Sequence, residues 1–312
     1  MKFQTQIPMK PGNNLLDYNS GIVLLGSCFV EHMGEKLRYF KFRELQNPFG
    51  ILFHPAAIAN LTERIKTGQG YTEGDIFQHN GRWHCFDTHS DRSGNTPGEV
   101  VTGINKTIAN TSDYLRTATH VIITLGTAWG YRLNETGILV ANCHKVPQSR
   151  FSKELASVTA IEEDIIRIRE NLRAVNPGIH LIFTISPVRH LKDGFVENQR
   201  SKAHLITALH SVLEEDTYFP SYEIVMDELR DYRFYAEDMI HPGKTAIDYI
   251  WEKFTQNHIS PEAVPVMKEV DAIRKGRSHR PFAPDSEQHL RFLDQLQRRI
   301  EALRKKVPHI SF

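Results

Sequence analysis

Short apolar runs separated by longer amphipathic stretches form the main pattern along this chain. The runs at residues 22–25, 121–125, 180–185 and 224–226 each stop at a glycine or a polar residue, as buried strands do. Apolar residues recur at helical spacing directly after the first run and again over residues 154–175, 198–213 and 245–254. Strands that alternate with helices predict βαβ units, and hence an α/β fold with a mostly parallel sheet and helices on both faces.

Two regions depart from this rhythm. Residues 67–107 mix Gly, His, Asp and Ser without a clear period, which predicts a loop insertion over the carboxyl face of the sheet. Residues 274–284 predict a basic linker, and residues 286–306 predict an amphipathic helix with a leucine-rich stripe. We therefore divide the chain into a main domain, 1–259, and a C-terminal extension, 260–312.

The stripe on the C-terminal helix admits several partners. It can dock on its own chain, with its cations favoured near the helix C-terminus, or it can form a homodimer as a coiled coil. Binding of nucleic acid by the same cations is the least favoured alternative. The net charge of +1 agrees with this ranking, because it gives no global field that would attract nucleic acid or an anionic membrane.

Composition narrows the cellular setting. The chain has 312 residues, of which 40% are hydrophobic, and it has only three cysteines, Cys28, Cys85 and Cys143, without a CxxC pair. This argues against a disulfide framework. The N-terminus lacks the apolar core of a signal peptide, and no apolar stretch approaches the roughly 20 residues of a membrane span. We expect a cytoplasmic protein without a membrane partner.

Ser27 follows the first apolar run and precedes the first helical stretch. It would thus lie on a turn at the carboxyl end of the parallel sheet, where open α/β folds bind their ligands. A serine there can act as a nucleophile beside free helix amides, or it can simply cap the helix. Taken alone, Ser27 fits the cap better.

Asp238 and His241 lie just before the last expected helix, in the spacing Asp-x-x-His. A nucleophilic serine needs such a pair: the imidazole takes the hydroxyl proton, and the carboxylate orients the ring and stabilises the imidazolium. The spacing is common by chance, but Ser27 and this pair can meet over one edge of the sheet. Together they favour a serine enzyme.

These residues carry a family resemblance. Ser27 with Asp238-x-x-His241 resembles the first and last motifs of the SGNH (GDSL-type) hydrolases, and Gly26-Ser27-Cys28-Phe29 resembles the signature of the GSCFA-domain family, a bacterial branch of that superfamily. Segments similar to the family continue over residues 21–254, at 47–50, 125–129, 142–145, 184–189, 197–202 and 218–223. The resemblance implies an SGNH-hydrolase-like (flavodoxin-like) sheet and serine esterase or acyl-transfer chemistry.

The resemblance also implies roles for single residues. Ser27 would be the nucleophile, His241 the base and Asp238 the residue that orients it. The oxyanion hole of the superfamily uses the amide of the nucleophile, a glycine after the second strand and an asparagine after the third. Gly50 matches the glycine. Gly126-Thr127-Ala128-Trp129 stands where the superfamily has Gly-x-Asn-Asp, so the asparagine is missing.

Thr127, Asn142 and Asn47 are the candidates to replace that donor. We favour Asn142, because Asn142-Cys143-His144-Lys145 places several donors in one turn, although Asn142 can equally be a turn former.

Other polar residues have open roles. A donor-rich group in the insertion (His79, His84, Cys85, Asp87 and His89), together with His144, has no standard zinc spacing. We therefore predict substrate contacts or rim hydrogen bonds there and no metal, while a metal-dependent hydrolase remains an alternative. Arg189 can bind a carboxylate or phosphate of a substrate, or pair with Glu197 or Asp227.

The sequence thus predicts a cofactor-free esterase that removes a small acyl group, such as acetyl, from a carbohydrate or similar small molecule through an acyl-Ser27 intermediate. The small acyl group rests on fold-level analogy alone. An acyltransferase with the same triad stays open. So does a non-catalytic ligand-binding module, because of the missing asparagine.

Overall fold

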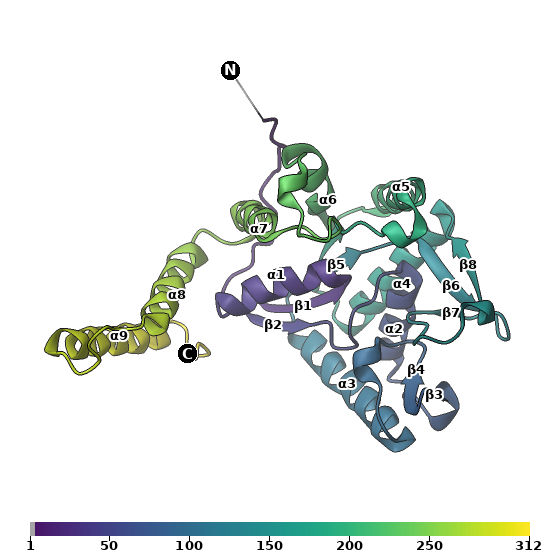
Figure 1. The fold of residues 1–312 in the computed structure, drawn as a ribbon, viewed down its shortest axis with the longest axis horizontal. Coiled ribbons are helices and arrows are strands. Elements are labelled where there is room, and N and C mark those ends of the chain that lie inside the picture. The colour runs from purple at the N-terminus through teal and green to yellow at the C-terminus, as the bar shows by residue number, and fades with distance from the viewer. Residues whose placement is uncertain (1–3) are drawn as a thin grey trace.

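The computed structural model describes residues 4–312 and is built around a five-stranded parallel sheet in the order β10-β9-β5-β1-β2 (Figure 1). The strands are β1 (Gly21–Gly26), β2 (Arg43–Gln46), β5 (His120–Leu125), β9 (His180–Ile185) and β10 (Thr217–Tyr218). The strand order reverses between β1 and β5, where Gly26 is in register with Thr124. Ligands of open α/β sheets bind outside the carboxyl ends of the strands at such a point. The expected α/β, flavodoxin-like fold class is confirmed.

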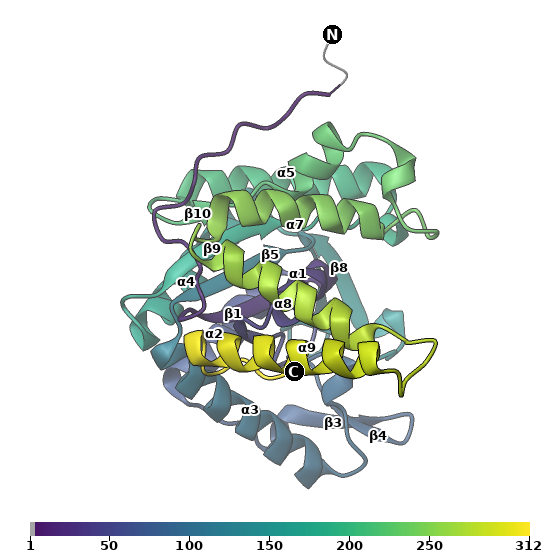
Figure 2. The same ribbon diagram turned by 90° about the vertical axis from the view of Figure 1, so that its left-hand side faces the viewer.

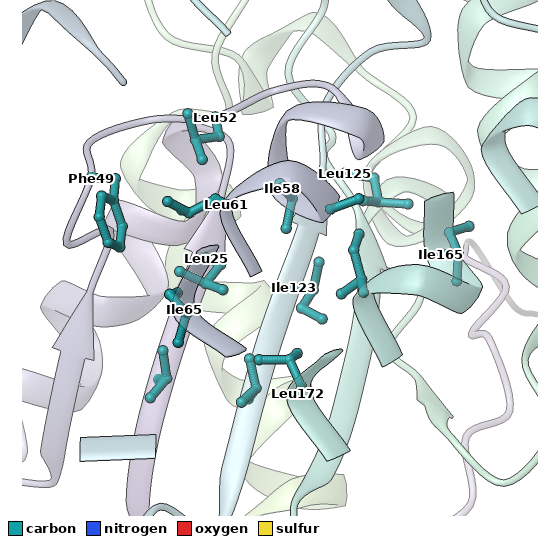
Figure 3. Packing of buried hydrophobic residues seen from close by; sticks show 14 of the residues in the cluster. Leu25, Phe49, Leu52, Ile58, Leu61, Ile65, Ile123, Leu125, Ile165 and Leu172 are labelled. Atoms are coloured by element: carbon teal, nitrogen blue, oxygen red, sulfur yellow. The ribbon is translucent and has the colours of Figure 1, made fainter. Parts of the chain in front are cut away.

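Both faces of the sheet are covered by helices. Alternate strand residues such as Val23, Leu25 and Ile123 pack on α2 (Pro55–Thr67), α3 (Pro97–Thr117), α4 (Val158–Val175) and α5 (Phe195–Val212). Figure 3 shows part of this core, with side chains of the sheet against those of α2 and α4. The intervening residues, Ile22, Leu24, Ile122 and Ile182, pack on α1 (Cys28–Tyr39) and α7 (Lys244–His258). Helix α1 starts directly at the end of β1.

The C-terminal extension is a pair of helices, α8 (Ala263–Ser278) and α9 (Glu287–Lys306), which lie side by side at one edge of the molecule (Figures 1 and 2). Leu296, Ile300 and Leu303 of α9 are buried in the same core cluster as α1 and α7, whereas Leu290 and Leu293 stay exposed. Residues 274–278, expected in a linker, are the last turn of α8, so that part of the prediction is wrong. Dimerisation through α9 stays a prediction.

Residues 67–107 are more ordered than a loop. They contain a short helix η1 (Glu73–Asp75), the hairpin β3 (Ile76–His79) and β4 (Arg82–Cys85), a second short helix η2 (Ser90–Arg92) and the first half of α3. A separate antiparallel sheet follows β5, made of β6 (Trp129–Leu133), β7 (Leu139–Val140) and β8 (Phe151–Leu155), with η3 (Gln148–Arg150) before β8.

Some expected elements need correction. Residues 224–226 are not a strand: α6 (Ser221–Glu223) continues into a π-helical segment, η5 (Ile224–Glu228). Here Ile224, Val225 and Glu228 are buried and Asp227 is exposed, a helical period that three apolar residues cannot reveal. The helix expected from residue 154 starts at Val158, because Glu154 and Leu155 pair with β6. Among residues 4–312, no helix combines the length and apolarity needed to cross a membrane.

Candidate active site

Ser27 occupies the turn from β1 into α1. Gly26 adopts φ +135°, and a Cβ on it would lie 2.2 Å from the carbonyl oxygen of Thr124 on β5. Ser27 is the N-cap of α1, and its Oγ accepts a long, 3.4 Å hydrogen bond from the amide of Phe29. The cap and nucleophile interpretations therefore use the same geometry. Ser27 is fully buried.

Asp238 and His241 share one tight loop between the short helix η6 (Tyr232–Phe234) and α7. The amides of Ile240 and His241 donate to Asp238 Oδ1 at 2.9 and 3.0 Å, and His241 Nδ1 donates to Asp238 Oδ2 at 2.6 Å. Hydrogen bonds from the backbone and ring of His241, and then from Ile240, lower the pKa of Asp238 to about 2. The carboxylate thus stays charged and fixes the imidazole, with Nε2 left as the basic ring nitrogen.

His241 and Cys28, the residue that follows Ser27, line the same cavity. This cavity, of about 590 Å³, lies at the carboxyl end of the sheet, and its wall includes His241, Cys28, Phe53, Thr127 and His190. Ser27 itself lies behind the wall. Within the described chain, 4–312, no hydrogen bond joins Ser27 to His241. The structure therefore forms the Asp238–His241 pair and brings His241 to the same cavity as the residue that follows Ser27.

Three of the expected oxyanion donors are already engaged. The amide of Ser27 donates to Thr124 O at 3.1 Å, and the amide of Gly50 donates to Asn47 O at 2.8 Å in a turn. The hydroxyl of Thr127 lies 3.0 Å from Ser201 Oγ and accepts from the amide of Trp129. The amides of Ser27 and Gly50 would have to leave these acceptors before they could hold an oxyanion, and so would the hydroxyl of Thr127 where it is the donor to Ser201.

Asn47 has a different arrangement. Its Oδ1 accepts from the amide of Gly26 at 3.0 Å, and its buried Nδ2 has no hydrogen-bond partner in the described chain. Because a buried unpaired donor is costly, this amide group next to the nucleophile turn needs an explanation. Asn142, which we favoured, accepts from the amide of His144 at 2.8 Å and lines the cavity.

His144 and the insertion form a second cavity, of about 740 Å³, which Asn142 also lines. His144 is buried with one ring nitrogen 2.7 Å from Cys85 O, and burial lowers its pKa to about 4. His84 is held by Ser93 and by the backbone of His79. Among residues 4–312, no three His, Cys, Asp or Glu side chains converge in a way that would hold a metal ion.

Arg189 pairs with neither Glu197 nor Asp227. Its guanidinium lies 5.2–5.7 Å from the ring centroids of Phe195, Tyr232 and Tyr235, and it donates to Met239 O at 3.0 Å. The amide of Arg189 also donates to Ile240 O. Arg189 therefore supports the loop that carries the Asp238–His241 pair, and it also lines the cavity.

Sequence reasoning assigned no chemistry to the segment 197–202, at the start of α5. In the structure its side chains form hydrogen bonds with the backbone just after β5 and β9. Asn198 accepts from the amide of His190, Ser201 accepts from the amide of Ala128, and Lys202 donates to two carbonyls of the strand ends. The only signal in the sequence was that this segment resembles the family.

Comparison with known proteins places the chain in a family. A model described as the GSCFA family matches residues 21–254, and one described as the C-terminal domain of GSCFA domain proteins matches residues 270–312. No curated protein matches. An acetyl xylan esterase (Est2A) from the rumen bacterium Butyrivibrio proteoclasticus is similar in structure, with a TM-score of 0.39 and 10% identity. That alignment covers 84% of this chain and 66% of the esterase, just under two thirds of its length. Since the first family model spans most of the sequence, this chain belongs to the GSCFA family.

Proposed function

We propose that this protein is a serine esterase whose nucleophile, base and orienting acid are Ser27, His241 and Asp238. The observation that carries the proposal is the 2.6 Å bond from His241 Nδ1 to Asp238 Oδ2, because it leaves Nε2 of a cavity-lining imidazole free to accept a proton. The position of Ser27 at the reversal of strand order and the family membership support it. A cavity of about 590 Å³ suits a small molecule.

In this mechanism Ser27 Oγ attacks the ester carbonyl while its proton passes to His241 Nε2. The tetrahedral intermediate collapses, the carbon–oxygen bond to the alcohol breaks, and the imidazolium returns the proton to the alcohol oxygen. Water then attacks the acyl-Ser27 ester with His241 again as base, which releases the acid and regenerates the serine. Ser27 is fully buried, so side chains of the cavity wall must move before the ester can reach it.

We assign Asn47 Nδ2 as an oxyanion donor in place of the missing asparagine. It is the one oxyanion candidate with a buried, unpaired side-chain N–H next to the nucleophile turn. Removal of such a donor reduces turnover by about 10²–10³-fold in enzymes that use one. The proposed substrate is a small acyl ester, acetyl-like, on a carbohydrate or similar small molecule.

A fluorophosphonate probe tests the proposal. We expect it to modify the peptide that contains Ser27, and we expect Ser27→Ala to abolish the label. Ser20→Ala is the matched control, because Ser20 is a buried serine just before the other end of β1 and should leave labelling unchanged.

An absence of label on Ser27 at every pH from about 6 to 9, a range that spans histidine titration, would refute the serine mechanism and favour a ligand-binding module. A series of p-nitrophenyl esters from acetyl to octanoyl tests the acyl size, and we expect activity to fall as the acyl chain lengthens. Equal or rising activity with the longer chains would contradict the small-acyl assignment.

A further inference from the structure

Lys202 is a fully buried cation that has no carboxylate partner in the part of the chain that the structure describes. It lies on α5 with 1% of its surface exposed, and no ion pair to it exists among residues 4–312. The other deeply placed lysine, Lys253 on α7, pairs with Glu228 at 3.0 Å. A buried ammonium without a counter-charge is strongly penalised, and burial lowers the pKa of Lys202 to about 7. The burial of this unpaired ammonium therefore needs a structural or functional explanation.

The bonds of Lys202 lead to the candidate active site. Its ammonium donates to the carbonyl oxygen of Gly126 at 2.6 Å, directly after β5, and to that of Ser186 at 2.7 Å, directly after β9. Gly126 lies against the nucleophile, because a Cβ on it would be 3.2 Å from the Cβ of Ser27. One ammonium therefore ties together the ends of the adjacent strands β5 and β9, of which β5 borders β1 and the turn of Ser27.

The charge of Lys202 also acts on groups around the cavity. It lowers the pKa of the Cys28 thiol, against a larger rise from burial and from Glu31. It also contributes, after burial, to lowering the pKa of His190 to about 3. On the remaining side, the ring of Tyr222 lies 5.8 Å from the ammonium. Within the described chain no carboxylate forms an ion pair with Lys202 that would neutralise this charge.

We propose that Lys202 is a positioning residue for the reaction at Ser27. Its ammonium holds the turn after β5, which lies against the nucleophile, to the turn after β9, and it supplies a positive charge near the site where negative charge develops on the oxygens of the tetrahedral intermediate. Such preorganised charge is effective where water is excluded. This inference rests on the proposed serine mechanism, and it assigns to α5 part of what the missing asparagine turn does in the superfamily.

Two variants separate the charge from the packing. Lys202→Met retains the apolar stem and removes the charge, and Lys202→Gln also retains an N–H donor. Lys253→Met is the control, because Lys253 is the other buried lysine of residues 4–312 and lies on α7. We expect both Lys202 variants to unfold cooperatively and to lose at least about tenfold in the rate of fluorophosphonate labelling at pH 6.5. We expect the control to label at the wild-type rate.

The pH profile distinguishes this role from a purely structural one. In the wild type, labelling should decline above about pH 7 as Lys202 loses its proton, and this decline should be absent in both variants. Alkylation of Cys28 by iodoacetamide, followed by mass spectrometry, gives a readout without catalysis. Loss of the Lys202 charge should slow the alkylation of Cys28 at pH 6.5, where wild-type Lys202 is protonated, because less of the thiol is then ionised.

The outcomes are distinct. If wild-type Ser27 is never labelled, but Cys28 is alkylated more slowly in the Lys202 variants, the serine mechanism fails. Only the placement of the Lys202 charge then survives. If Ser27 is labelled and both variants match the wild type in rate, pH profile and Cys28 alkylation, the inference is overturned. It is equally overturned if neither variant unfolds cooperatively, since Lys202 is then required for the fold alone.

Discussion

Asn47 combines two tasks in one side chain. Its backbone adopts φ +38°, which Asn tolerates better than most residues, and this brings Oδ1 to the amide of Gly26. The same geometry leaves Nδ2 buried and unpaired beside the nucleophile turn. A purely structural asparagine would satisfy both ends of its amide, so the free N–H is what favours a role in the reaction.

Asn47→Asp tests this role, because it replaces the side-chain NH₂ group of Asn47 with an oxygen. Aspartate tolerates the left-handed backbone and retains an oxygen for the Gly26 amide, but it lacks the N–H. We expect the rate of Ser27 labelling to fall about 10²-fold. Asn80→Asp is the control, since Asn80 also has a positive φ in the β3–β4 turn and should label normally. Labelling of Asn47→Asp at the wild-type rate would exclude Asn47 as an oxyanion donor.

The residue types of the candidate site were predictable from the sequence. Which of its hydrogen-bond donors are free was not. Ser27, Asp238 and His241 follow from local position and spacing, and the structure forms the Asp238–His241 pair. The preference for Asn142 over Asn47 rested on a donor-rich local turn. Whether a donor is free depends on carbonyls from distant strands, such as Thr124 for the amide of Ser27, and no local pattern reports them.

At the scale of elements, the contact between β1 and β5 sets the nucleophile turn. Gly26 is required at this contact, because its φ of +135° disfavours side chains and the Thr124 carbonyl occupies the space of a Cβ.

The hydrophobic pattern of the sequence did not predict β2 or the helical state of η5. Strand β2 (Arg-Glu-Leu-Gln) lies at the sheet edge with little burial, so it has no apolar run to reveal it.

Gly26→Ala should therefore destabilise the protein by about 3 kcal/mol or more, from backbone strain plus overlap with the β5 backbone. Gly81→Ala is the matched control: Gly81 has φ +73° but open space around its Cα, so only the strain of about 1–2 kcal/mol applies. Urea unfolding measures both free energies. Equal losses for the two variants would show that β1 and β5 can separate to admit a methyl group.

For the whole molecule, buried histidines couple stability to pH. Burial is the main cause that lowers the pKa of His54, His120 and His258 to about 4, from 6.5 in the unfolded chain. Between these values the unfolded chain binds protons that the folded protein does not. Stability is therefore full above about pH 6.5, falls as the pH drops towards 4, and changes little from this source below that.

Each of these histidines should lower the free energy of unfolding by about 2 kcal/mol between pH 7.5 and pH 5. Urea unfolding at pH 7.5, 6.5 and 5 measures this change in the free energy of unfolding. His258→Phe retains a ring among Phe219 and Phe254 and should reduce proton uptake on unfolding by about one. A free energy of unfolding that stays constant from pH 7.5 to 5 would contradict this account.

By itself, the sequence determined the α/β fold class, the positions of β1, β5 and β9, and the pairing of Asp238 with His241, because these depend on local periodicity and on spacing within one turn. Only the tertiary structure decided which amides are engaged, and that within residues 4–312 Asn47 retains a free N–H and Lys202 bridges two strand ends without a counter-charge. Those features arise where segments far apart in the chain meet, and hydrogen-bond competition and burial are set there by neighbours that no local pattern encodes.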